Sequence, residues 1–235
     1  MNKFDLVRSL YVGSNRKSIN ERLKLNVPME QWIIDTVNHH GISHKGKLLN
    51  NWEKASEKID KTCKIDAVHK INDKENLYIQ VKFRQPDSGN DIEVAVIQPY
   101  NGLKEFKNVI GVDPTTLQKE VWARDFRFYG QFYACLNNSW NLLRIVNYNA
   151  IKSKVMTLLG EWVDSGNELK PYYGKNTFIS KKYGGMMLKC KKDSGYNSYD
   201  SGILKILCYI PEEVFTKKEM VCVEMIQPPE YLIKN

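Results

Sequence analysis

The sequence predicts an α/β sandwich followed by a β-rich extension, and three changes of pattern along the chain predict it. A helical pattern follows Pro28, apolar and polar residues alternate from about Cys63, and short apolar segments separated by polar loops follow Gly166. The expected order is helix, three strands, helix, strand, helix and then β-structure, which is typical of an α/β sandwich. We therefore expect a core over 1–164 and an extension over 165–235 that packs on it.

The composition indicates a globular, basic protein. Hydrophobic residues make up 42% of the 235 residues and charged residues 26%, which argues against general disorder. The chain has 35 Lys and Arg against 27 Asp and Glu, and its net charge of +8 favours a polyanionic partner. No apolar run approaches the roughly 20 residues of a membrane helix, and the first residues lack the apolar core of a signal peptide. The five cysteines form no CxxC pair, so we expect thiols in a reducing cytoplasm.

The first elements are expected to be helical. Residues 1–27 predict one or two docking helices, and Pro28 is suited to the first turn of a longer helix that Gly41 would end. A second helical stretch is expected from Lys47 to about Asp60, with a solvated, charged face. The apolar face of the longer helix is formed by Met29, Trp32, Ile33, Val37 and His40.

Three histidines cluster at the end of this first long helix, namely His39, His40 and His44. Such a cluster is compatible with zinc or with an HNH nuclease, but no thiolate or imidazole partners follow at finger-like spacing. The alternative is a helix end with solvated imidazoles, and we favour it.

Strands and helices alternate in the middle of the chain. Strands are expected over 63–68, 77–83 and 91–98, with a turn over 72–76. Asp113 and Pro114 form a cap and a first turn for a long helix that runs to about Leu136. A strand over 142–148 and an amphipathic helix over 150–162 complete the core. In the extension, strands are expected near 176–181, 185–190, 203–210 and 219–226.

The residues best suited to chemistry lie on the first two expected strands. Asp66 is on the first strand, and Gln80 and Lys82 are two apart on the second, so they share a face. Ile79, Val81 and Phe83 should then enter the core from the opposite face. Carboxylate and amide oxygens can hold Mg²⁺, and an ammonium group can stabilise charge on a phosphate. The alternative is that Gln80 and Lys82 only line the wet face of a hairpin.

The hairpin with Asp66 and Gln80-Val81-Lys82 resembles the signature of the PD-(D/E)XK nuclease superfamily, which has the restriction-endonuclease-like fold. The resemblance covers about 28–148 and implies a central mixed sheet flanked by helices. It also implies a metal-binding carboxylate at Asp66 and a catalytic lysine at Lys82. The family normally has Glu where this chain has Gln80, although Mrr-type restriction endonucleases often carry QxK. An amide is the weaker metal ligand.

The resemblance also implies an acidic residue on the helix before the hairpin. Glu30 fits this position best, with Glu53 and Glu57 as rivals, and Asp60 is a weaker candidate for a supporting role. An acidic residue in a first helical turn also complements the helix dipole, so the metal role of Glu30 stays one of two interpretations.

Basic residues outside the hairpin are candidates for DNA contact. Arg124, Arg127 and Gln131 share one face of the expected long helix, which packs beside the active site in the resembling family. In the extension, lysines interleave with tyrosines and can follow a nucleic-acid backbone, although charged loops are more often merely solvated. The candidate DNA-binding residues are Arg84, Arg124, Arg127, Gln131, Lys189, Lys191 and Lys192.

These expectations combine into one function and one rival. The first is an endonuclease that uses Mg²⁺ or Mn²⁺ to hydrolyse DNA, most suitably duplex DNA, as restriction, homing and phage nucleases do. Its catalytic residues would be Asp66, Gln80 and Lys82, its metal ligands Asp66, Gln80 and Glu30, and a homodimer would match duplex symmetry. The rival is a catalytically inactive module of the same fold that binds nucleic acid or a partner protein. The sequence lacks GxxxxGK[ST], GxSxG and HExxH motifs and has no GxGxxG after a strand, which disfavours nucleotide-driven motors, dinucleotide oxidoreductases and serine hydrolases.

Overall fold

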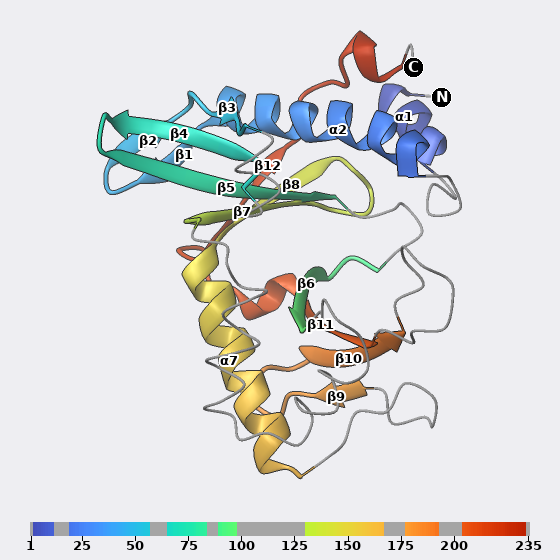
Figure 1. Cartoon of the computed structure of the whole chain (residues 1–235), viewed down its shortest axis with the longest axis vertical. Helices are drawn as coiled ribbons and strands as arrows, with labels where there is room; N and C mark the ends of the chain where they lie inside the picture. The colour runs from blue at the N-terminus through green and yellow to red at the C-terminus, as the bar shows by residue number, and fades with distance from the viewer. Residues whose placement is uncertain are drawn as a thin grey trace. The chain divides into compact units, whose positions relative to one another are not determined.

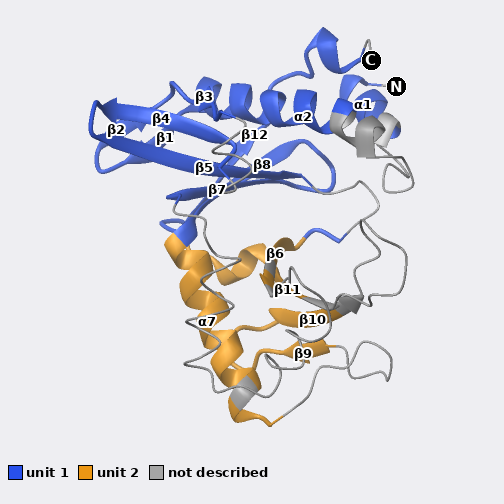
Figure 2. Ribbon diagram, in the orientation of Figure 1, with its two compact units in different colours: residues 1–90, 128–148, 217–235 blue, residues 91–127, 149–216 orange. Residues whose placement is uncertain are grey.

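The computed structural model describes residues 2–11, 19–56, 65–83, 89–97, 130–166, 177–192 and 204–233. The chain divides into two compact units, each formed from separate stretches of sequence (Figure 2). Unit 1 contains Met1–Asn90, Phe128–Tyr148 and Lys217–Asn235, and unit 2 contains Asp91–Arg127 and Asn149–Thr216. This division differs from the expected one, because the boundary predicted between residues 164 and 165 falls inside unit 2.

A six-stranded mixed sheet forms the centre of unit 1, in the order β12-β8-β7-β5-β4-β3. Its strands are β3 (Glu53–Lys54), β4 (Ala67–Asn72), β5 (Glu75–Phe83), β7 (Phe132–Leu136), β8 (Leu142–Asn147) and β12 (Met220–Glu224). Neighbouring strands are antiparallel except β5 and β7, which are parallel. The predicted α/β character is confirmed.

Helix α2 (Ile19–His40) lies along one face of this sheet, and α1 (Lys3–Tyr11) packs beside it (Figure 1). The predicted apolar face is buried from Met29 to Val37, whereas His40 is exposed. The helix does not begin at Pro28 as expected; it continues back to Ile19 and contains the proline. Gly41 ends it as predicted, with a φ of 72° that favours glycine.

The prediction of a helix over 47–60 was wrong, because the described part of that stretch forms strands. A hairpin of β1 (Ile42–His44) and β2 (Lys47–Leu49) is followed by β3. Lys45 and Gly46 join β1 to β2 with φ angles of 49° and 77°, which is the backbone of a two-residue hairpin turn. The turn-forming Lys45-Gly46 pair therefore overrides the helical spacing of the apolar residues that follow.

The third predicted strand was also assigned to the wrong sheet. The predicted strand over 91–98 exists as β6 (Ile92–Ile97), but it belongs to unit 2 and pairs with another strand there. On the side away from β4, the neighbour of β5 is β7, in a stretch where a helix was expected to run to about Leu136. All five residues of β7 are buried, so it shows no alternation that would distinguish a strand from a helix. The earlier part of that expected helix, up to residue 129, lies outside the described residues.

Unit 2 contains a four-stranded antiparallel sheet in the order β6-β11-β10-β9 and most of α7 (Tyr148–Asp164). Its further strands are β9 (Thr177–Ile179), β10 (Met187–Lys192) and β11 (Leu204–Ile210), followed by the 3₁₀ turn η3 (Glu212–Val214). The predicted helix over 150–162 and the predicted strands of the last third of the chain are confirmed. A second 3₁₀ turn, η4 (Glu230–Leu232), belongs to unit 1.

A glutamate organises the turn between β9 and β10. The Glu161 carboxylate of α7 accepts hydrogen bonds from the main-chain N–H groups of Lys181 and Lys182, at 2.7 and 3.2 Å. The Ser180 hydroxyl donates to the same carboxylate and accepts from the N–H of Tyr183 at 2.8 Å. One acidic side chain thus holds this turn against α7.

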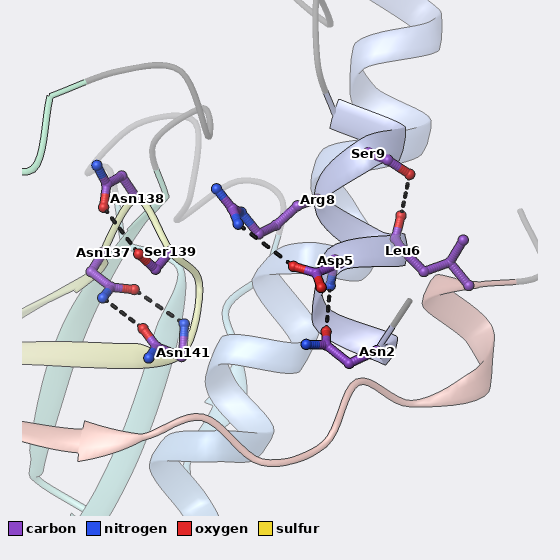
Figure 3. A network of polar contacts seen from close by, with 9 residues as sticks. All are labelled: Asn2, Asp5, Leu6, Arg8, Ser9, Asn137, Asn138, Ser139 and Asn141. Carbon is purple, nitrogen blue, oxygen red and sulfur yellow. Dashed lines mark hydrogen bonds and ion pairs between the residues drawn. The ribbon is translucent and has the colours of Figure 1, made fainter.

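Asparagine side chains close the turn between β7 and β8 (Figure 3). Asn137 Oδ1 accepts from the main-chain N–H of Asn141 at 3.1 Å, and Asn137 Nδ2 donates to Asn141 Oδ1 at 2.8 Å. Within this turn the buried Trp140 has a φ of 60° and packs edge-on against Phe83. Figure 3 also shows Asn2, which accepts from the N–H of Asp5 at 2.8 Å and caps α1.

None of the described helices combines the length and the apolar character that crossing a membrane requires. The described cysteines carry thiols that are not joined in disulfides: Cys135, Cys190 and Cys208 are buried, and Cys222 is exposed.

Candidate functional site

The hairpin of β4 and β5 carries Gln80 and Lys82, and Asp66 immediately precedes its first strand. The two strands are antiparallel, with Ala67 opposite Ile79, and are joined through the turn at Asp73 and Lys74. Strand β5 is an interior strand of the six-stranded sheet. The predicted hairpin is therefore confirmed, but its first strand is Ala67–Asn72 where 63–68 was expected, so Asp66 precedes the strand on which it was predicted.

Alternation along β5 separates the core from the candidate site. Leu77, Ile79 and Val81 are buried in the core that α2 covers. Gln80 and Lys82 are on the opposite face, where Gln80 is half-buried and Lys82 is exposed. Because Lys82 is exposed, its ammonium group is within reach of an anion from solvent.

Asp66 is anchored to both neighbouring strands. Its main-chain N–H donates to the Ile79 carbonyl at 3.0 Å, and its carbonyl accepts from the N–H of Ala55 at 2.9 Å. Its carboxylate Oδ2 accepts from the main-chain N–H of Val81 at 2.5 Å. Strand β4 begins only at Ala67, so the side chain of Asp66 supplies the acceptor that Val81 needs at the strand's end. The carboxylate is thereby fixed beside the residue that separates Gln80 from Lys82.

The next strands continue the face that carries Gln80 and Lys82. Gln80 is in register with Tyr133, and Lys82 with Cys135, and both of these β7 side chains are buried. Cys135 is in turn opposite Arg144 on β8, which is 1% exposed.

Arg144 is a feature that the sequence interpretation missed. Its Nη1 donates to the Asn90 carbonyl and its Nη2 to the Leu136 carbonyl at 3.5 Å, so it binds the start of another segment to the sheet. The sequence does contain a signal for this role, a single arginine within the apolar segment LLRIVN. An arginine buried with such a strand needs hydrogen-bond acceptors nearby.

Each of the two described acidic candidates outside the hairpin, Glu30 and Glu53, forms an ion pair with a lysine. Glu30 on α2 forms an ion pair with Lys54 of β3, with 3.6 Å between Oε2 and Nζ. Lys54 is paired with Ala67, so Glu30 is close to the start of β4. Glu53 is exposed and pairs with Lys70 at 3.5 Å. Glu57 and Asp60 lie outside the described residues.

Two of the three clustered histidines lie exposed at the end of α2, as the solvated helix end predicts, whereas His44 lies on β1. His39 and His40 are exposed in the last turn of α2, and His40 Nε2 lies 2.7 Å from the Glu224 carbonyl. His44 on β1 packs edge-on against Phe132. Within the described ranges, no three His, Cys, Asp or Glu side chains gather closely enough to hold a metal ion.

One of the candidate DNA-binding residues has a structural role. Gln131 is not on a helix but immediately precedes β7, where its Oε1 accepts from the N–H of Tyr78 and its own N–H donates to the Tyr78 carbonyl. The prediction that Gln131 shares a helical face with arginines was therefore wrong. Lys189 is half-buried on β10, and Lys191 and Lys192 continue that strand. Arg84, Arg124 and Arg127 lie outside the described residues.

Comparison with family models, with curated proteins and with solved structures finds no match to this chain.

Proposed function

We propose that the protein is a metal-dependent endonuclease that hydrolyses phosphodiester bonds of DNA. The hydrogen bond from the main-chain N–H of Val81 to the Asp66 carboxylate carries this proposal. It ties a carboxylate to the strand segment that presents Gln80 and Lys82 on one face. The net charge of +8 and the resemblance of this hairpin to PD-(D/E)XK nucleases support a polyanionic substrate.

Asp66 and Gln80 would hold the metal ion. Both carry oxygen donors, which Mg²⁺ and Mn²⁺ prefer, and Mg²⁺ is commonly bound through one or two carboxylates while water and substrate phosphate complete its shell. A site with few protein ligands therefore fits the donors that the hairpin offers. When bound, such an ion polarises the scissile phosphate and lowers the pKa of a coordinated water.

The chain's own residues would then perform three tasks. Val81 fixes the orientation of the Asp66 carboxylate through its N–H, so that group needs little reorganisation. Lys82 presents an exposed ammonium group that can bind a phosphate oxygen and stabilise charge as the P–O bond breaks. Gln80 can coordinate a metal ion through Oε1 while its Nε2 donates a hydrogen bond to the substrate.

A plasmid-nicking assay with matched variants tests the proposal. We expect Mg²⁺-dependent nicking that EDTA abolishes. The nicking rates of Lys82→Ala and Asp66→Asn should be reduced about 10²-fold or more. The matched control is Lys74→Ala, because Lys74 is an exposed lysine in the turn of the same hairpin. Equal nicking by the wild type, Lys82→Ala and Lys74→Ala would reject the catalytic role of Lys82, and equal nicking by Asp66→Asn would reject that of Asp66.

The second candidate is an inactive module that binds nucleic acid or a partner protein. Two observations favour it: Gln80 replaces the family's glutamate, and the part of the chain that the structure describes has no cluster of three metal-binding side chains. Calorimetry with Mg²⁺ and Mn²⁺ separates the candidates. The enzyme should bind metal, and Gln80→Glu should bind it more tightly because a carboxylate replaces an amide. The module should bind duplex DNA in a salt-dependent way without binding metal or cutting.

A further inference from the structure

The hairpin of β1 and β2 lies in a stretch of the chain without acidic residues. No Asp or Glu occurs over 36–52, which contains Lys45, Lys47 and three histidines. Both lysines are exposed, Lys45 in the turn of the hairpin and Lys47 directly after it. Among the described residues neither forms an ion pair, whereas Lys54 and Lys70 on the following strands pair with glutamates. The tip of the hairpin therefore presents two positive charges that no described carboxylate pairs.

The two faces of this hairpin have different surroundings. On the inner face, the paired residues Ile42 and Leu49 are buried in the core of unit 1. On the outer face, the paired residues Ser43 and Leu48 are exposed, and Leu48 is 62% exposed. A Cβ atom at Gly41 would lie 2.6 Å from Leu48 Cδ1, so the leucine side chain rests on that glycine. The core thus anchors the hairpin, while its outer face presents a supported apolar side chain to solvent.

Lys45 occupies a backbone position that other residues fill more easily. Its φ of 49° is left-handed, and Asn, Asp and Gly adopt this conformation in a two-residue hairpin turn at lower cost. Uncommon backbone conformations of this kind cluster at functional sites. Lysine is not the residue that the turn itself favours, so we attribute its presence at the tip to its charge.

We propose that the hairpin of β1 and β2 is a DNA-binding element that enters the major groove. A two-stranded β-ribbon fits this groove, which is about 12 Å wide in B-DNA. Lys45 and Lys47 bind backbone phosphates, and Leu48 contacts base edges such as thymine methyl groups. The inference rests on the proposed function for its choice of DNA as the polyanion. It adds a binding surface outside the DNA-binding residues that the sequence predicts.

Fluorescence anisotropy of the full chain with a labelled DNA duplex tests the inference in EDTA, where no metal-dependent cutting occurs. We expect Lys45→Ala/Lys47→Ala to raise the Kd about tenfold or more at about 0.1 M salt. The slope of log K against log [salt] should become shallower by about 2, one unit for each phosphate contact. The control is Lys217→Ala/Lys218→Ala, which removes two exposed lysines before β12. Equal effects of the two double variants would overturn the inference, as would a wild type that does not bind the duplex.

The variant Lys45→Asn separates the loss of charge from the loss of folding. Asparagine favours the left-handed conformation, so the variant should be at least as stable as the wild type in urea. Its Kd for the duplex should nevertheless rise about threefold or more. An unchanged Kd would overturn the contact of Lys45 with phosphate.

The variant Leu48→Ala tests the contact with base edges. It should raise the Kd and leave the salt slope unchanged, because it removes an apolar contact and no charge. The control is Val27→Ala, since Val27 is an exposed aliphatic residue of α2 in the same unit. Circular dichroism checks that both variants fold. An effect of Leu48→Ala no larger than that of Val27→Ala would overturn the groove contact.

The outcomes for the hairpin and for the nuclease are distinguishable. Hairpin variants with weakened binding, together with a wild type that does not nick DNA, would retain the DNA-binding element and reject the enzyme. Metal-dependent nicking, together with hairpin variants that bind DNA as tightly as the wild type, would reject the element and retain the enzyme.

A membrane surface is the alternative partner for lysines beside an exposed leucine. Sedimentation with phosphatidylserine vesicles provides this arm of the test. Vesicle binding that Lys45→Ala/Lys47→Ala abolishes, with DNA binding unchanged, would overturn the inference. Absence of vesicle binding, with DNA binding weakened in the same variant, would support it.

Discussion

The Asp66 carboxylate and the main-chain nitrogen of Val81 lie 2.5 Å apart, within one hydrogen bond. This bond serves the fold, because it gives an interior strand an acceptor where β4 has not yet begun. It also serves the candidate site, because it holds a negative charge beside Gln80 and Lys82. A substitution at Asp66 therefore changes stability as well as any metal-dependent activity, and the two effects need separate measurement.

We expect Asp66→Ala to lower the free energy of unfolding by about 1–3 kcal/mol, because the N–H of Val81 loses a charged acceptor. Asp66→Asn keeps an acceptor oxygen of the same reach and should cost less. Urea denaturation of both variants measures the difference. An Asp66→Asn protein that is as stable as the wild type but does not nick DNA would assign the charge to chemistry. Equal destabilisation by Ala and Asn would contradict the acceptor role.

Removal of the Glu161 carboxylate should loosen the turn between β9 and β10. Glu161→Ala leaves the N–H groups of Lys181 and Lys182 without this acceptor, at a cost of about 1–3 kcal/mol. Limited digestion with trypsin reads this locally, because cleavage after either lysine should accelerate. Glu161→Gln, which keeps one acceptor oxygen, should show a smaller acceleration. Unchanged cleavage in Glu161→Ala would show that the carboxylate does not hold the turn.

Tyr231 should make stability depend on alkaline pH. Burial, reinforced by the Asp35 carboxylate that accepts its hydroxyl at 3.0 Å, raises the pKa of Tyr231 above its usual value of 10. Because the folded pKa is the higher one, the contribution of the phenol is complete below pH 10 and is lost as the pH rises further. Tyr231→Phe should cost about 0.5–1 kcal/mol at neutral pH, since the residue is 40% exposed. Its unfolding free energy should fall less than that of the wild type between about pH 8 and about pH 11. Parallel curves for the two proteins would contradict this coupling.

The described thiols should differ sharply in reactivity. Burial raises the pKa of Cys190 to about 11 and raises that of Cys208 further, so both stay protonated and covered near neutral pH. Cys222 is exposed and should react first with a disulfide reagent. Mass spectrometry of peptides from a Cys63→Ser variant measures each rate. Labelling of Cys190 as fast as that of Cys222 would require the sheet of unit 2 to open frequently.

The local part of the site was predictable from the sequence. Alternation of Ile79, Val81 and Phe83 with polar residues assigned Gln80 and Lys82 to one face, and the structure has that arrangement. The hydrogen bond from the N–H of Val81 to the Asp66 carboxylate was not predictable. It depends on the exact residue at which β4 begins, and the sequence does not fix that boundary to within one residue.

Strand pairing was the part that the sequence did not determine. The segment FYACL is apolar throughout, since β7 lies inside the sheet and is buried on both faces, and such a run has no period. The predicted strand over 91–98 was correct as a strand but was assigned to the wrong sheet, because β11, its partner in unit 2, lies about a hundred residues later. The local hydrophobic pattern indicates which side chains are buried. It does not indicate which of several distant strands a given strand pairs with.

The interleaved composition of unit 1 has a consequence for synthesis on the ribosome. Trp32 in α2 donates to the carbonyl of Ile226, and among the described strands β12 is the second neighbour of β8. A nascent chain that has emerged as far as Thr216 therefore carries α2, β5 and β8 without the strand that completes their sheet. Until the following residues emerge, that sheet exposes the edge of β8 to chaperones and to other nascent chains.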